Sequence, residues 1–482
     1  MSLEATLFIA FLGASFMIGS IASRYINNVS DYYVAGARMP WFLLVGTFVA
    51  SNVSAGTFLG ATNMSGSVGY ALWAAFVPTS IGFVLGIAFV GVKVRRLAEK
   101  YEILDFADIL AVRYNSKADW IRILTTLTLP LVYIPMLAAQ LIGIGTIASG
   151  VFELPYTAIL IAITTLIIIY TMLGGMLGVI WTDGFQFVVL LAGLLIAVPV
   201  AMSSYGGGNA LHGWEMLSEN WTGNHSWTTE KWPWFIALGQ FVWLFSIPVQ
   251  PHLVTRFLAA KDERTILTAL PVCLVAGFII FISIVPIGLL GSAVSQSAQD
   301  GTYYYINLTR TLLGPWLGAF ALAGIAAAAL STCSTVLIVT GQSLSREIYQ
   351  KLITPHATQR QALIAARLAI IVVGSMAFAI ALYRPIGIFW LVVLSASLLA
   401  SVFFIPIFAG LFMKTATAAG ALTAMISGGI GAILVYTINS IFDTHIFIHE
   451  VFAGVGASAL AMFFANRFSS IKPDEEAVIQ SI

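Results

Sequence analysis

The amino-acid sequence predicts an all-helical membrane protein that crosses the bilayer many times. Apolar residues make up 59% of the 482 residues and charged residues only 9%, whereas soluble domains carry about 25% charged residues. The mean hydropathy is +0.94. The apolar residues are gathered into runs of about 20, the length that an α-helix needs to cross a hydrocarbon core. Together these observations exclude a soluble globular domain.

Thirteen apolar runs are long enough to form transmembrane helices. They cover residues 5–23, 41–66, 67–92, 123–149, 155–175, 184–203, 233–255, 265–292, 313–344, 364–383, 385–413, 415–438 and 446–466. The acidic Glu4 and the lack of basic residues before the first run indicate a first span, not a cleaved signal peptide. The loop at 93–117, rich in both charges, is expected to hold a short amphipathic helix and to be a solvated connector.

The basic residues predict the orientation of the chain. With the N-terminus outside, all but three of the 22 Lys and Arg residues fall in inner loops or inner span ends, the exceptions being Lys231, Arg310 and Arg384. Cytoplasmic loops attract Lys and Arg. We therefore expect a multi-pass protein of the plasma membrane (the bacterial inner membrane), with its N-terminus outside and its C-terminus in the cytoplasm.

Composition also argues against several classes of function. A net charge of +1 and the lack of a dense basic run argue against nucleic-acid binding. The two cysteines, Cys273 and Cys333, lie in apolar runs and offer no zinc spacing. The six histidines are scattered, so no membrane-embedded enzyme is expected. No feature indicates an obligatory protein partner; the expected partners are a small solute, sodium and the lipid bilayer.

Two predicted spans are interrupted by residues that disfavour a regular helix. The run SNVSAG at 51–56 places small and polar residues in the middle of span 41–66. In span 233–255, Pro248 and Pro251 remove two amide donors, and Gln250 between them needs polar partners that lipid cannot supply. Irregular backbone survives at membrane depth only where it lines a cavity. A tight helix contact at the first run and a simple proline kink at the second are the alternatives.

A third feature is a cluster of hydroxyl groups in the ninth span, on Ser331, Thr332, Ser334 and Thr335. Ser331 and Thr335 are four residues apart and share one helical face. Such hydroxyls, with carbonyls freed by a break elsewhere, supply neutral oxygen ligands for a monovalent cation, whereas calcium or magnesium would favour carboxylates. The alternative is that each hydroxyl bonds to its own helix.

The spacing of the breaks predicts an internal repeat. Spans 2–6 and 7–11 each contain five helices, and each set begins with an interrupted helix, which is typical of an inverted-repeat transporter with a central site. We therefore divide the chain into a peripheral helix with its loop (1–40), a first repeat (41–203), an extracellular loop (204–232), a second repeat (233–413), and two peripheral helices with a short tail (414–482).

Three ionisable residues lie at predicted span ends. Asp183, at the inner end of span six, either stabilises a helix N-terminus or faces a cation route. His252 and Arg256 follow Pro251 one helical turn apart and are interpreted as interfacial anchors.

Several of these segments resemble a known family. The run GGMLGVIWTDGFQ at 174–186 resembles the signature of the sodium:solute symporter family, as does DYYVAG at 31–36. Gln250-Pro251-His252, followed by Arg256 and Phe257, is similar to its proline-transporter branch. The resemblance extends from about residue 5 to 466. It implies a LeuT-type fold of 13 transmembrane helices with a core of two inverted five-helix repeats, and sodium-coupled symport of a small solute into the cell.

The resemblance also implies ligands for the transported sodium ion. The principal site would use the backbone carbonyls of Ala50, Val53 and Ala328 and the hydroxyls of Ser331 and Thr332. Some members have a second sodium site, which would correspond here to Asp183, Ser331, Ser334 and Thr335.

The substrate pocket implied by the resemblance lies beside the two breaks. Asn52 stands where the proline branch has an aspartate, and Ile247 where it has a tyrosine, so the solute stays open among carboxylate-bearing nutrients such as an amino acid, pantothenate, sialic acid or a monocarboxylate. Trp243 is similar to a substrate-contacting tryptophan of that branch. The expected pocket residues are Asn52, Ser54, Gly56, Trp243, Ile247 and Gln250. The alternatives are a proton-coupled transporter of the same fold and a symporter-like membrane sensor.

Overall fold

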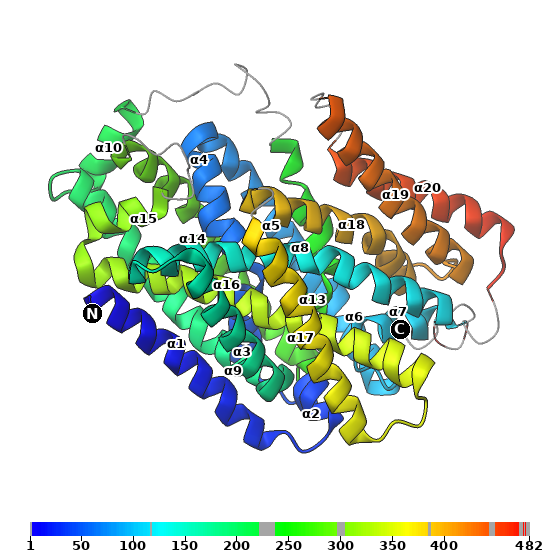
Figure 1. Cartoon of the computed structure of the whole chain (residues 1–482). Helices are drawn as coiled ribbons and strands as arrows, with labels where there is room; N and C mark the ends of the chain where they lie inside the picture. Colours follow the sequence, from blue (N-terminus) through cyan, green and yellow to red (C-terminus); the bar gives the residue numbers. More distant parts are fainter. Residues whose placement is uncertain are drawn as a thin grey trace.

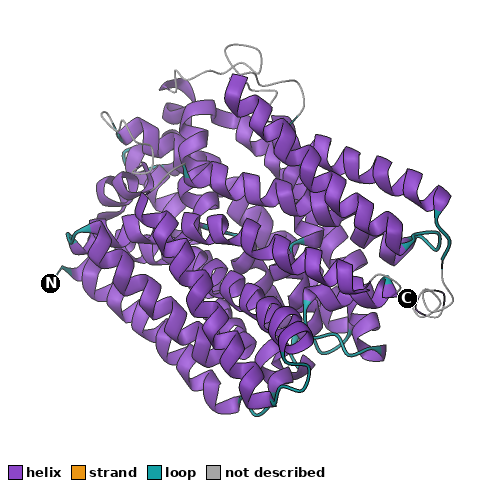
Figure 2. Ribbon diagram, turned by 45° about the vertical axis from the view of Figure 1, so that its right-hand side comes forward, coloured by secondary structure: helices purple, strands orange, loops and turns teal. Residues whose placement is uncertain are grey.

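Helices make up the regular structure throughout the part of the chain that the computed structural model describes, residues 2–115, 118–220, 237–295, 304–383, 387–442 and 449–471 with residues 476 and 478 (Figure 2). Extended pairing in these ranges is limited to an isolated bridge between Met39 and Ala260. The helices are α1 Leu3–Ala22, α2 Val29–Val34, α3 Trp41–Asn52, α4 Thr62–Val68, α5 Phe76–Val84, α6 Val92–Lys100, α7 Phe106–Arg113, α8 Ala118–Phe152, α9 Tyr156–Tyr205, α10 Ala210–Asn220, α12 Val242–Ser246, α13 Pro251–Ala259, α14 Glu263–Val294, α15 Tyr304–Leu308, α16 Gly314–Ser343, α17 Gln359–Tyr383, α18 Ile388–Phe412, α19 Ala418–Phe442 and α20 Glu450–Phe468.

The number of membrane-crossing helices differs from the sequence prediction. Ten helices of the described residues are long and apolar enough to cross a membrane, and an eleventh is obtained when α3 is joined to the bent segment that follows it. Predicted spans 155–175 and 184–203 form the single bent helix α9. Predicted span 233–255 consists of short pieces, and its first residues lie outside the described part of the chain. The count of thirteen is therefore not confirmed.

The bend in α9 explains the glycine pair of the 174–186 motif. Gly175 has φ 54° and ψ −155°, a backbone conformation that residues with a side chain rarely adopt. A Cβ atom on Gly175 would lie 2.6 Å from the ring of Tyr32, and one on Gly174 would lie 2.7 Å from the carbonyl oxygen of Gly19. The Tyr32 hydroxyl donates to the carbonyl of Met172 at 3.1 Å. The two motif segments, 31–36 and 174–186, therefore meet in the fold.

Helix α16 lies at the centre of the bundle. It contacts α1, α3, α8, α9 and α17, and its most apolar stretch is completely buried. Figure 1 shows α1 along one edge of the molecule and the paired helices α19 and α20 at another, where they contact α18. The hydroxyl cluster of the ninth predicted span is on α16, so it lies in the interior of the protein.

Candidate ion and solute site

The first predicted break is present, and it frees backbone carbonyls. Helix α3 ends at Asn52, Val53 is extended (φ −93°, ψ 132°), and the segment that follows is bent by 52° from α3. The amide of Ser54 donates to the Thr57 hydroxyl at 3.2 Å and so does not continue the helical pattern to the carbonyl of Ala50. The amide of Ala55 donates to the buried side chain of Gln140 at 2.7 Å. The break is thus held by specific polar contacts, as unpaired backbone groups in a buried environment require.

The hydroxyl cluster of α16 faces this break. The Ser331 hydroxyl lies 2.8 Å from the carbonyl oxygen of Ala50 and 2.9 Å from that of Ala328. The Thr332 hydroxyl lies 3.2 Å from the carbonyl oxygen of Val53 and 3.1 Å from that of Ala328. All five residues are completely buried. The five oxygen atoms named for the principal sodium site therefore converge, although they come from two distant segments.

The chemistry of this oxygen set suits a monovalent cation. Each hydroxyl donates to a carbonyl in this structure, and rotation of its proton would turn a lone pair toward an ion instead. All five oxygens are neutral, so a bound sodium ion keeps its full charge within the bundle.

The second predicted break is also present. Helix α12 ends at Ser246, a short 3₁₀ turn follows over Ile247–Val249, and Gln250 is extended (φ −64°, ψ 117°) before α13 begins at Pro251. Because Pro251 is the first residue of α13, its missing amide costs no helical hydrogen bond. Close contact with span 72–100 holds this segment in place: a Cβ on Gly82 would lie 2.7 Å from the carbonyl oxygen of Trp243.

A cavity lies between the two breaks. It is narrow in this structure, with a volume of about 30 Å³, and Gly56 after the first break and Trp243 on α12 both line it. The other walls are mostly aromatic or aliphatic, among them Trp73, Phe76 and Val392. The indole of Trp243 donates to the side-chain oxygen of Gln240 at 3.1 Å. A cavity with apolar walls and a few polar groups is typical of a small-molecule site.

Two of the six predicted pocket residues line this cavity, Gly56 and Trp243. Ser54, Ile247 and Gln250 are buried close to the breaks without lining it, and Asn52 is the half-buried last residue of α3. Gln240 was missed. It lies one turn before Trp243, and its spacing of three residues from that tryptophan places both on one face.

Asp183 lies in a buried polar cluster whose other members include Thr47, Ser51 and Arg256, which were not expected beside it. Its Oδ2 atom accepts hydrogen bonds from the hydroxyls of Thr47 at 2.5 Å and Ser51 at 3.2 Å. The guanidinium of Arg256 donates to the same atom at 3.1 Å and also donates to the hydroxyls of Thr335 and Ser51. Both charged side chains have no exposed surface.

Two interpretations of the span ends are therefore wrong. Arg256 and His252 are not interfacial anchors, because both side chains are fully buried, Arg256 against Asp183 and His252 against the hydroxyl of Tyr133. Asp183 does not cap a helix N-terminus, because it lies well inside α9, past the bend at Gly175. The sequence gives little indication that Asp183 and Arg256 form a pair, because the two residues are on different helices and 73 positions apart.

The residues named for a second sodium site are brought together only in part. The Thr335 hydroxyl lies 3.4 Å from Asp183 Oδ2. The Ser334 hydroxyl instead lies 3.1 Å from the carbonyl oxygens of Leu330 and Ser331 on its own helix, which was the alternative considered for the whole cluster. Ser331 faces the principal oxygen set.

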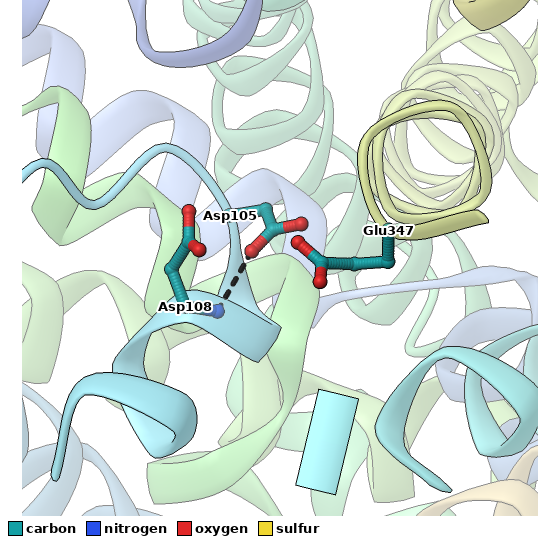
Figure 3. Close-up of side chains that lie close together, drawn as sticks. All are labelled: Asp105, Asp108 and Glu347. Carbon is teal, nitrogen blue, oxygen red and sulfur yellow. Dashed lines mark hydrogen bonds between the residues drawn. The ribbon is translucent and has the colours of Figure 1, made fainter. Parts of the chain in front are cut away.

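A second charged cluster lies between the N-terminal end of α7 and the helical segment Leu344–Ile353 that follows α16. Asp105, Asp108 and Glu347 place carboxylate oxygens within 4.8 Å of one another (Figure 3). The Asp108 carboxylate forms ion pairs with Arg122 at 2.6 Å and with Arg346 and Lys351, each at 2.9 Å. Arg122, Arg346 and Lys351 thus supply the positive charge that the carboxylates of Asp108 and Glu347 need.

The same cluster corrects the expectation for the loop at 93–117. A short helix is present, α7, but its residues are mostly buried and do not form a solvated connector. Burial raises the pKa of Asp105, and the charges of Asp108 and Glu347 raise it further. Burial also acts to raise the pKa of Asp108, but Arg346, Lys351 and Arg122 outweigh it and hold that pKa well below its usual range.

Two interrupted helices that meet beside a buried set of neutral oxygens define an ion-coupled secondary transporter. This chain belongs to the sodium:solute symporter family, whose family model matches residues 32–428. It is 24% identical to the sodium/proline symporter of Haemophilus influenzae, with 97% of this chain and 95% of the relative covered. It is 25% identical to the sodium/pantothenate symporter of Escherichia coli, with 98% of each covered.

Solved structures show the same fold. A Na⁺-coupled sialic acid symporter in its substrate-bound, outward-open state superimposes with a TM-score of 0.81 at 19% identity, over 98% of both chains. MhsT in complex with L-phenylalanine superimposes with a TM-score of 0.56 at 14% identity, over 89% of this chain and 99% of that one. The chain is therefore a multi-pass membrane protein of the LeuT-type fold that performs sodium-coupled symport, with Na⁺ as the coupling ion.

Proposed function

We propose that this symporter imports a compact carboxylate with an apolar body, and that sodium binds to Ala50, Val53, Ala328, Ser331 and Thr332. The observation that carries the ion assignment is the convergence of these five oxygens, two of them hydroxyls within 2.8–3.2 Å of carbonyls from the broken helix. Neutral ligands do not titrate near neutral pH, which favours sodium over a proton as the driving ion.

The cavity supports the proposed class of solute. The helical segment that continues from Ala55 begins at the break, and the N-terminal end of a helix favours a negative group. Gly56, at this end, lines the cavity, while Trp243, Phe281 and Val392 offer apolar surface for the rest of the solute. The relatives' names make proline and pantothenate the first compounds to test.

The experiment is uptake into proteoliposomes that contain the purified protein. A panel of labelled carboxylates is offered with an inward sodium gradient, with an inward proton gradient, or with neither. We expect accumulation of a compact carboxylate with the sodium gradient alone. Accumulation driven by the proton gradient without sodium would contradict the ion assignment, and uptake restricted to uncharged solutes would contradict the solute class.

We also propose that the N-terminus lies outside the plasma membrane and the C-terminus in the cytoplasm, with residues 41–203 and 233–413 as the two inverted repeats. The distribution of Lys and Arg supports this orientation. Its test is labelling of a single cysteine at Ser2 or at Ser469 by a membrane-impermeant reagent in intact cells, in a Cys273→Ser, Cys333→Ser background. Labelling is expected at position 2 only; labelling at 469 only would reverse the orientation.

A further inference from the structure

The cluster around Asp183 has the composition of a cation site. A carboxylate and the hydroxyls of Thr47, Ser51 and Thr335 meet in a volume from which solvent is excluded. A buried carboxylate needs a compensating positive charge, because an isolated charge in such surroundings is costly. Here the compensating charge belongs to the protein: the guanidinium of Arg256 lies 3.1 Å from Asp183 Oδ2.

The guanidinium contacts the same atoms that an ion would use. It donates to Asp183, to Ser51 and to Thr335, and these groups come from three different helices, α9, α3 and α16. The pair is electrically neutral, so a sodium ion added beside it would bring an uncompensated charge and would be repelled by Arg256. The Oδ1 atom of Asp183 is buried and has no hydrogen-bond partner among the described residues; it would be open to an ion only if Arg256 moved away.

The cluster also adjoins the principal oxygen set. Ser51 belongs to both: its hydroxyl lies 3.3 Å from Arg256, and its carbonyl oxygen lies 3.4 Å from the hydroxyl of Thr332. A change of charge at Asp183 therefore alters the electrostatic potential at the principal oxygen set. Two sodium ions, one bound at each set, would lie close together and repel each other.

We propose that Arg256 is a tethered cation in the place of a second coupling sodium, so that this chain moves one sodium ion for each solute. The inference rests on the proposed principal site. In this arrangement Asp183 does not bind a transported ion; it positions Arg256, which joins the broken helix α3 to α9 and α16.

The first test is the coupling ratio of the unaltered protein in proteoliposomes. The ratio of sodium ions to solute molecules is obtained from the membrane potential and sodium gradient at which net solute flux stops. We expect a ratio of one, and a sodium Hill coefficient of one. A ratio or Hill coefficient of two would overturn the inference while leaving the principal site intact. Uptake that needs no sodium would instead overturn the proposed function.

The second test removes the tethered charge. Arg256→Gln leaves Asp183 uncompensated, and sodium is expected to take its place, so that the Hill coefficient rises toward two. Arg256→Lys keeps a cation and is expected to stay at one, as is the neutral pair Asp183→Asn with Arg256→Gln. A value of one in folded Arg256→Gln would overturn the inference, because the pair would then be a structural contact only. If Arg256→Gln does not fold, the coupling ratio of the unaltered protein still decides.

Discussion

The hydroxyl of Ser331 lies 2.8 Å from the carbonyl oxygen of Ala50, although 281 residues separate them. This contact joins the continuous helix α16 to the end of the interrupted helix α3. Any motion that separates α3 from α16 breaks the oxygen set apart, and a cation that bridges the two helices favours the arrangement in which they are together. At the proposed sodium site, ion binding and helix position would therefore depend on the same atoms, as ligand-driven population shifts require.

Thr332→Ala should weaken sodium binding. The change deletes one of five neutral oxygens, and the loss of one such contact costs about 1–3 kcal/mol, equivalent to an about five- to 150-fold higher sodium concentration at half-maximal uptake. By reciprocity, solute binding at fixed sodium should weaken as well. Thr340→Ala is the matched control, because the Thr340 hydroxyl lies on the same helix and donates to the carbonyl of Val336. Equal sodium dependence of the two variants would contradict the site.

Trp243→Ala should weaken solute binding. The indole lines the cavity, and burial of a large side chain's surface contributes about 1–3 kcal/mol. Binding of sodium without solute should change little, because Trp243 is not among the five oxygen-bearing residues. Trp316→Ala, which removes an indole that is 64% exposed, is the control. Calorimetric titration of solute and of sodium separates the two effects, and unchanged solute affinity would place the pocket elsewhere.

Asp183→Asn should destabilise the protein more than the paired change of Asp183→Asn with Arg256→Gln. The single change leaves a fully buried guanidinium without its counter-charge, and breaking such a pair costs about 3–5 kcal/mol. The double change removes both charges and should recover much of that loss. The measurement is thermal unfolding in detergent without sodium or solute; a double variant no more stable than the single one would contradict the ion pair.

The acid cluster beside α7 should give opposite results for its two aspartates. Asp108→Asn removes one of the two carboxylates that Arg122, Arg346 and Lys351 contact, the other being Glu347, and should cost about 1–3 kcal/mol through the loss of charged hydrogen bonds. Asp105→Asn should be tolerated, because the asparagine oxygen can still accept from the Asp108 amide, as Asp105 does at 2.8 Å, and because burial disfavours the charged carboxylate there. Thermal unfolding at pH 7 compares the two; equal losses would contradict this assignment.

The same pair predicts a dependence on pH. The pKa of Asp108 is lowered in the folded protein, so its stabilising contribution is present above the ordinary pKa of about 4 and is lost as the pH falls below it. The pKa of Asp105 is raised, so its contribution has the opposite sign and weakens the fold as the pH rises from about 4 toward its raised pKa. The stability of Asp105→Asn relative to the unaltered chain should therefore increase as the pH rises above about 4 in thermal unfolding. A pH-independent difference would contradict the raised pKa.

Local chemistry made much of this fold predictable. Runs of about 20 apolar residues require helices in a membrane. The small and polar run at 51–56 predicted the first break, and Pro248 and Pro251, which cannot continue a helix, predicted the second; both breaks are present. The five oxygens of the principal set were named from the family resemblance, and the structure brings them together. The number of spans was less predictable, because Gly174 and Gly175 look like a loop in sequence, whereas contacts with Gly19 and Tyr32 make them a bend within α9.

The sequence by itself determined that this chain is a helical membrane protein, where its helices are interrupted, and which family it resembles, because these depend on composition and on short segments. Only the tertiary structure decided that Arg256 lies against Asp183 and that Asp108 is buried among three cations. Whether a charged residue near a span end meets solvent or another charge depends on which helices cross there. That crossing is set by the packing of α3, α9, α13 and α16 against one another, and no local pattern of residues records it.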